Sequence, residues 1–138
     1  MTDFSDCNHG AKPIPIPEEQ VFEILGEQGF ANLVAEFYRK VREDDLIGPM
    51  YPPDDWEGAE KRLCDFLIFR FGGPPRYVEE RGHPRLRGRH MPFSIGEAER
   101  DRWLELMDAA FVAADTDSRA AATLKEFFVP TADFMRNH

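Results

Sequence analysis

The apolar residues between Gly29 and Glu43 recur every three or four positions, and this spacing restricts the fold more than any other feature. Residues three and four apart lie on one face of an α-helix, so the segment predicts a helix with one buried stripe. The stripe consists of Phe30, Leu33, Val34, Phe37, Tyr38 and Val41. The same period returns along most of the chain, and no segment alternates convincingly as a half-buried strand would. We therefore expect an all-α fold.

Proline and glycine pairs divide the chain into its helices, because both residues interrupt regular structure. The pairs are Gly48-Pro49, Pro52-Pro53 and Gly72-Gly73-Pro74-Pro75. Helices are predicted over residues 18–27, 29–43, 55–71, 94–114 and 118–136. Ser94 and Glu97 match a capping box at the start of the fourth helix. Pro130 should kink the fifth, because it cannot donate a hydrogen bond back to Glu126. Residues 76–93 show little regular pattern beyond a short helical turn ending near His90.

Length and charge limit the classes of protein that fit. The 138 residues and 42% hydrophobic content predict one packed domain at 18–138, after an extended proline-bearing tail at 1–17. A net charge of −9 argues against nucleic acid and anionic membranes as partners. No apolar run reaches the roughly 18–20 residues that a membrane span needs. The start of the chain lacks the pattern of a signal peptide, and two cysteines make no disulfide framework, so we expect a cytoplasmic protein.

The segment 71–93, FGGPPRYVEERGHPRLRGRHMPF, carries the strongest chemical signal. It holds His83 and His90 together with five arginines, although the whole chain is acidic. Such a cluster suggests a site for an anionic ligand. Motif searches give nothing else: the chain has no P-loop, no HExxH, no CxxC and no GxSxG.

Together with FYRKV before it and ERDRWLELM after it, this segment resembles the group II truncated haemoglobins over about residues 20–136. The resemblance implies a shortened globin fold, in which two helices lie over two others around a haem (protohaem IX with iron), and a long irregular segment before the iron ligand. His90 matches the family's RxRH-x-PF pattern, which implies that His90 binds the iron; imidazole suits that metal. We interpret His83, which precedes Pro84, as a residue that structures the loop.

The resemblance also implies hydrogen-bond donors on the side of the haem where ligands bind. They are Tyr38 of FYRKV, Tyr51 of MYPPDD and Trp103 of RDRWL. Hydroxyl and indole groups can donate to dioxygen, which acquires partial negative charge on haem. The alternative is that these three side chains only fill the core. Ala59 stands where ordinary globins often place a histidine, and alanine cannot donate.

Other residues are expected to contact the haem itself. Leu63 and Phe66 should line its face, although both are equally ordinary core residues. Arg62 and Tyr77 match positions that reach the haem propionates, and a guanidinium suits a carboxylate. Arg87 and Arg89 are candidates for the same role, with a solvated basic loop as the alternative.

The resemblance implies a protein that binds dioxygen and other small diatomic ligands, for scavenging or for oxygen transport. One alternative is a haem enzyme that converts nitric oxide with dioxygen to nitrate or reduces peroxide. Such an enzyme would need a separate reductase, because this chain has no room for a flavin or nicotinamide domain. A haem-based sensor or interaction protein is the other alternative.

Overall fold

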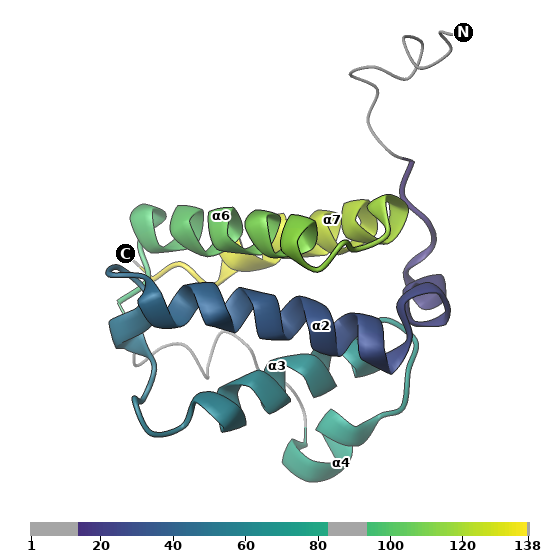
Figure 1. Cartoon of the computed structure of the whole chain (residues 1–138), viewed down its shortest axis with the longest axis horizontal. Helices are drawn as coiled ribbons and strands as arrows, with labels where there is room; N and C mark the ends of the chain where they lie inside the picture. The colour runs from purple at the N-terminus through teal and green to yellow at the C-terminus, as the bar shows by residue number, and fades with distance from the viewer. Residues whose placement is uncertain (1–13, 83–93, 138) are drawn as a thin grey trace, which may run out of the picture.

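The computed structural model describes residues 14–82 and 94–137, and this part of the chain contains helices without a strand (Figure 1). The all-α prediction is therefore confirmed. The α-helices are α2 (Val21–Glu43), α3 (Trp56–Arg70), α4 (Arg76–Arg81), α6 (Glu97–Ala113) and α7 (Ser118–Phe134). Two single 3-10 turns accompany them, η1 (Glu18–Gln20) and η2 (Gly48–Met50). None of the described helices has both the length and the apolar character to cross a bilayer.

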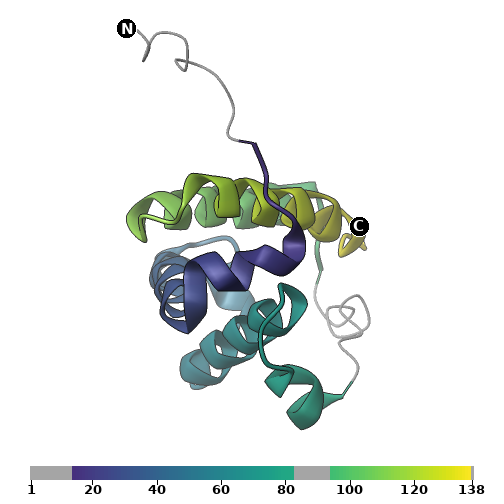
Figure 2. The same ribbon diagram turned by 90° about the vertical axis from the view of Figure 1, so that its right-hand side faces the viewer.

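Helix α2 lies between two pairs of helices, α6 with α7 and α3 with α4 (Figure 1). In Figures 1 and 2, α6 and α7 form the upper layer, α2 lies directly beneath them, and α3 lies below α2. Helix α2 packs against both α6 and α3, while α6 packs against α7 and α3 against α4. The predicted stripe of α2 fills the space between the layers. Its residues are fully buried or nearly so: Phe30, Leu33, Val34, Phe37, Tyr38 and Val41.

The first two predicted helices, 18–27 and 29–43, are joined in the structure as η1 and α2. Their separation survives only as a kink at Gly26, whose φ of 67° and ψ of 178° are not helical. Glycine lacks the Cβ atom that makes a positive φ costly, so it can turn the chain at this point. The predicted break between two helices is therefore present, but it lies at Gly26 and not at residue 28, because one glycine is enough for the bend.

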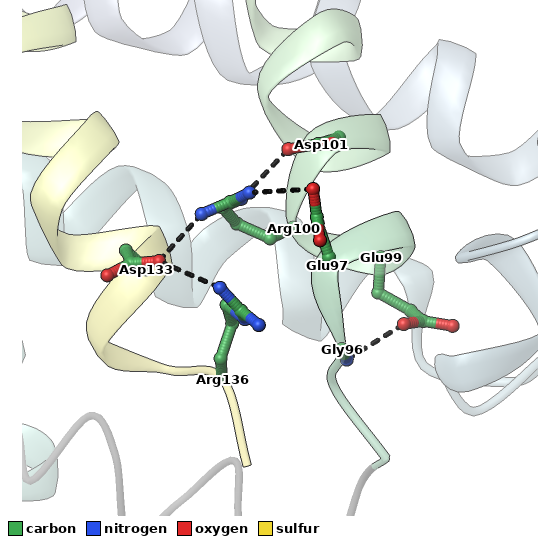
Figure 3. A network of polar contacts seen from close by, with 7 residues as sticks. All are labelled: Gly96, Glu97, Glu99, Arg100, Asp101, Asp133 and Arg136. Atoms are coloured by element: carbon green, nitrogen blue, oxygen red, sulfur yellow. Dashed lines mark hydrogen bonds and ion pairs between the residues drawn. The ribbon is translucent and has the colours of Figure 1, made fainter. Parts of the chain in front are cut away.

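The predicted capping box of Ser94 and Glu97 was also wrong. Helix α6 begins at Glu97 after Gly96, whose N–H donates to Glu99 Oε1 at 2.8 Å (Figure 3). Glycine has no side chain to return a bond, so only the carboxylate half of a box forms. Ile95 is paired with the end of the chain: its N–H donates to Asn137 Oδ1 at 2.9 Å, and its carbonyl accepts from Asn137 N–H at 2.8 Å. The helix starts only after this pairing.

Ion pairs strengthen the contact between the start of α6 and the end of α7. Arg100 Nη1 lies 2.6 Å from Asp133 Oδ1, and Arg100 Nε lies 2.8 Å from Asp101 (Figure 3). Arg136 approaches the same Asp133 oxygen at 3.4 Å. Helix α7 runs through Pro130 to Phe134 without interruption. The ion pairs of Asp133 thus hold the end of α7 against the start of α6.

The described part of the N-terminal tail is fastened to α7 by a single buried hydroxyl. Thr123 Oγ1 accepts from Ile16 N–H at 2.8 Å and donates to Ile16 O at 2.7 Å. Thr123 is 2% exposed, so both bonds are shielded from water. Ile16 packs on the core, whereas Ile14 is 79% exposed. Of the two tail isoleucines, therefore, only Ile16 packs on the domain.

Asp117 caps α7, and its removal should destabilise the fold. Its Oδ1 accepts the N–H groups of Arg119 at 3.0 Å and Ala120 at 3.1 Å. We expect Asp117→Ala to lower the free energy of unfolding at pH 7 by about 1 kcal/mol, measured by urea denaturation. Asp117→Asn keeps a capping oxygen and is the matched control, with little loss expected.

The difference in the free energy of unfolding between wild type and Asp117→Ala should depend on pH. The Ala120 backbone hydrogen bond, opposed by burial, helps to hold the pKa of Asp117 below its usual value. A depressed folded-state pKa stabilises above the unfolded pKa, and the benefit disappears as the pH falls through the folded value. The difference in their free energies of unfolding should therefore become smaller below about pH 4. A difference that stays constant down to acid pH contradicts a capping role for the charged carboxylate.

Candidate functional site

Three segments bring aromatic side chains together at the connection between α2 and α3. Tyr38 comes from α2, Tyr51 follows η2, and Trp56 opens α3. The Tyr38 ring meets Tyr51 edge-on at 5.6 Å and lies 6.3 Å from Trp56. Tyr51 stacks on Trp56 at 5.3 Å, and the Arg42 guanidinium lies 5.5 Å from the Trp56 ring centroid. Arg42 thus adds a cation–π contact to this stack.

Trp103 joins this group from the other layer of the fold. It lies on α6, with its ring 4.9 Å from Phe37 and 5.2 Å from Phe128. Side-chain hydrogen bonds link Tyr51 to both Tyr38 and Trp103. We call Tyr38, Tyr51, Trp56 and Trp103 the aromatic cluster. The structure therefore brings together the three side chains that the sequence singled out as donors.

The tyrosines of the cluster are held as neutral phenols. Burial raises the pKa of Tyr38 well above its usual value of 10.0, and the neighbouring Tyr51 raises it further. Burial also raises the pKa of Tyr51, although hydrogen bonds from Tyr38 and Trp103 oppose that rise. The opposite effects of this hydrogen bond on the two pKa values are those expected if Tyr38 donates and Tyr51 accepts. With Trp103 also donating to it, the Tyr51 hydroxyl would then keep its own proton for another acceptor.

An apolar face of α3 adjoins the cluster. Ala59, Leu63 and Phe66 follow each other at helical spacing, so they share that face. Ala59 and Phe66 are each 7% exposed, and Leu63 is half-buried against the core. Phe66 meets the Tyr77 ring of α4 edge-on at 5.4 Å. Such a face could lie against a flat and largely apolar cofactor.

The two candidates for carboxylate binding differ in their surroundings. Arg62 on α3 already pairs with Asp55 at 2.8 Å, with both side chains more than a third exposed. Tyr77 is 5% exposed, and the Arg81 guanidinium lies 6.0 Å from its ring centroid. The Asp55 partner was not predicted, and a ligand carboxylate would have to share Arg62 with it.

Some predicted site residues cannot be placed. Arg87, Arg89, His90 and the rival histidine His83 lie outside the described residues. Conversely, Trp56 belongs to the cluster and was not singled out from the sequence. A large aromatic residue five positions after Tyr51, at the start of a predicted helix, was the available signal.

A family model described as bacterial-like globin matches residues 20–137. Two-on-two hemoglobin-3 of Arabidopsis thaliana is 35% identical over 128 residues, which cover 91% of this chain and 73% of that protein. The hemoglobin of Chloroflexus aurantiacus has a TM-score of 0.82 at 40% identity, covering 86% of this chain and 98% of that structure. The truncated oxygen-avid haemoglobin of Bacillus subtilis has a TM-score of 0.81 at 36% identity, covering 85% and 98%. These matches confirm the expected two-over-two arrangement of helices.

The direction of the Tyr38–Tyr51 hydrogen bond can be tested by alkaline titration. Tyr51→Phe removes an acceptor that favours neutral Tyr38, so the pKa of Tyr38 should move down toward 10.0. Tyr38→Phe removes a donor to Tyr51, so the pKa of Tyr51 should rise further. Phenolate absorbance against pH measures both, and Tyr77→Phe serves as a control that should move neither. Shifts of the same sign in both variants would contradict the assigned direction.

Proposed function

The chain belongs to the group II truncated haemoglobins of the bacterial-like globin family and is a haem-binding globin, and we propose that it binds dioxygen and other small diatomic ligands reversibly. The observation that carries this proposal is the meeting of Tyr38, Tyr51 and Trp103 beside an apolar face of α3. Polar hydrogen-bond donors next to an apolar surface suit a small ligand held on a flat ring.

The described residues fit a haem on the side where ligands bind. Haem supplies an iron at which a small diatomic molecule can bind. Ala59, Leu63 and Phe66 offer an apolar face for the ring, and the methyl group of Ala59 is the smallest side chain among them. We assign the iron ligand to His90, on the support of the RGRHMPF segment alone.

We assign the retention of the ligand to the donors of the aromatic cluster. Ala59 has no donor group, so hydrogen bonds must come from Tyr38, Tyr51 or Trp103. If Tyr38 and Trp103 both donate to Tyr51, the Tyr51 hydroxyl has its own proton left for a ligand. Trp103 can therefore act on a ligand directly or by fixing the Tyr51 hydroxyl. A hydrogen bond by either route should slow the release of dioxygen. Carbon monoxide should be affected less, because it carries less negative charge when bound.

We assign the haem carboxylates to Arg62 and Tyr77, with Arg87 and Arg89 as further candidates. The Arg62 guanidinium is partly exposed, and its bond to Asp55 leaves other N–H groups for a second carboxylate. The Tyr77 ring contacts Phe66, which places α4 next to the apolar face of α3.

The first experiment on the proposed binding of diatomic ligands is an absorption spectrum of purified protein. A Soret band that shifts with carbon monoxide supports it, and a colourless protein that takes up no added haem contradicts it.

His90 should be required for haem retention and His83 should not. His90→Gly removes the proposed iron ligand, so the variant should lose haem or retain it only with added imidazole. His83→Ala should keep a near-normal Soret band. The assignment is reversed if His83→Ala is the variant that loses the band.

Trp103→Phe should release dioxygen faster, because it keeps an aromatic ring and removes the N–H group. The loss of a donor worth about 1–3 kcal/mol raises the dissociation rate by about 5- to 150-fold. Rapid mixing measures this rate, and carbon monoxide release should change less. Tyr38→Phe and Tyr51→Phe should be measured alongside, since the remaining donors can compensate. An unchanged rate in the single variant and in both tyrosine backgrounds would leave Trp103 as a packing residue.

Arg62→Ala combined with Tyr77→Phe should speed the transfer of haem to a scavenger protein. Both substitutions remove groups that we assign to the propionates, and neither removes the iron ligand. Arg39→Ala, which breaks an exposed pair with Glu36 on α2, is a matched loss of one surface arginine. Equal transfer rates in the double variant and the Arg39→Ala control would count against the propionate assignment.

A further inference from the structure

One carboxylate joins the two segments that carry Tyr51 and Trp103. Asp44 follows the last residue of α2, and its side chain is only 8% exposed. Its Oδ2 atom accepts the backbone N–H groups of Leu46 at 3.0 Å and Ile47 at 2.9 Å. Its Oδ1 atom accepts from Arg102 Nη1 at 2.5 Å. Asp44 thus uses both oxygens, one within its own connection and one across to α6.

The partners of Asp44 lie close in sequence to residues of the aromatic cluster. Ile47 is 3% exposed and is followed by η2, after which the chain reaches Tyr51. Arg102 is the residue immediately before Trp103 on α6. Helix α2, which ends immediately before Asp44, also carries Tyr38. Figure 1 shows the end of α2 and the beginning of α6 on the same side of the molecule.

We propose that Asp44 and Arg102 form a positioning clamp, which holds Trp103 against Tyr51 and thereby sets how slowly dioxygen leaves. This inference rests on the proposed function, and it assigns a role to residues that do not touch the ligand. The packing of Trp103 on Phe37 and Phe128 is apolar and non-directional. The charge-assisted bond from Arg102 to Asp44 instead fixes the position of α6 relative to the end of α2, directly beside Trp103 in the sequence.

The neighbouring acidic residues do not share this role. Asp45 lies 3.4 Å from the same Arg102 Nη1 atom but is 96% exposed, and Glu105 lies 3.6 Å from Arg102 Nε and is 72% exposed. Exposed pairs of this kind contribute little, because water screens them. Burial raises the pKa of Asp44, yet the hydrogen bonds from Ile47, Arg102 and Leu46 outweigh it and hold that pKa below its usual value. Asp44 is therefore charged at neutral pH.

A double-mutant cycle separates positioning from general stabilisation. Arg102→Ala should raise the dioxygen dissociation rate of the haem-loaded protein by about fivefold, as expected when contacting residues are coupled. In a Trp103→Phe background the same change should have almost no further effect, because the indole is already gone. Arg102→Lys keeps a charged donor and should restore most of the wild-type rate. Asp45→Asn, which removes the exposed partner of the same arginine, should leave the rate unchanged.

A second measurement does not depend on dioxygen. Hydrogen exchange of the Trp103 indole N–H, followed by NMR with Trp56→Phe to assign the two indoles, should be faster in Arg102→Ala than in Asp45→Asn. Equal exchange in these two variants, or equal acceleration of dioxygen release by Arg102→Ala in both backgrounds, overturns the clamp. If Trp103→Phe itself leaves dioxygen release unchanged, the donor role proposed above fails. The two failures are thus distinguishable.

Discussion

The burial of helix α2 between the two layers is the constraint on which the rest of this structure depends. Helix α2 packs against α6 and α3, and six of its apolar residues are completely shielded from water. Full burial of one such side chain contributes about 1.5–3 kcal/mol, so no other arrangement of this helix competes. Because α2 is fixed, Tyr38 is fixed at the junction of both layers, where Tyr51, Trp56 and Trp103 meet it.

Hydrogen bonds between polar groups then fix the relative positions of segments that apolar packing alone would allow to shift. Packing is tolerant of small shifts along a helix, whereas a hydrogen bond has a preferred distance and direction. Three side chains use this property where segments distant in sequence meet: Asp44 toward α6, Thr123 toward Ile16, and Asn137 toward Ile95. The side chains of Asp44 and Thr123 each make at least two hydrogen bonds, and Asn137 pairs with Ile95 through its side chain and its backbone N–H. The candidate site lies next to the first of these connections.

Several features of the site could be predicted from the sequence, and others could not. The helical stripe of α2 was found by periodicity, and Tyr38, Tyr51 and Trp103 were singled out by resemblance; the structure brings these three side chains together, while their role as donors stays a prediction. Trp56 was missed because nothing in its local pattern distinguishes it from an ordinary helix start. The pairing of Arg62 with Asp55 was missed because a charged residue on a helix surface has many candidate partners. The start of α6 was misplaced because the pairing of Ile95 with Asn137 overrides a local capping signal.

The sequence by itself determined the four long helices, the buried face of α2, and the family to which the chain belongs, because these depend on local spacing and on a long continuous motif; it missed the short helix α4. Tertiary structure alone decided that Tyr38 meets Tyr51, that Trp103 reaches Tyr51, and that Asp44 meets Arg102 across 58 positions. The physical reason is that the period of a helix specifies which face is apolar. The partner of a buried polar group, however, depends on where a separate helix is brought to rest.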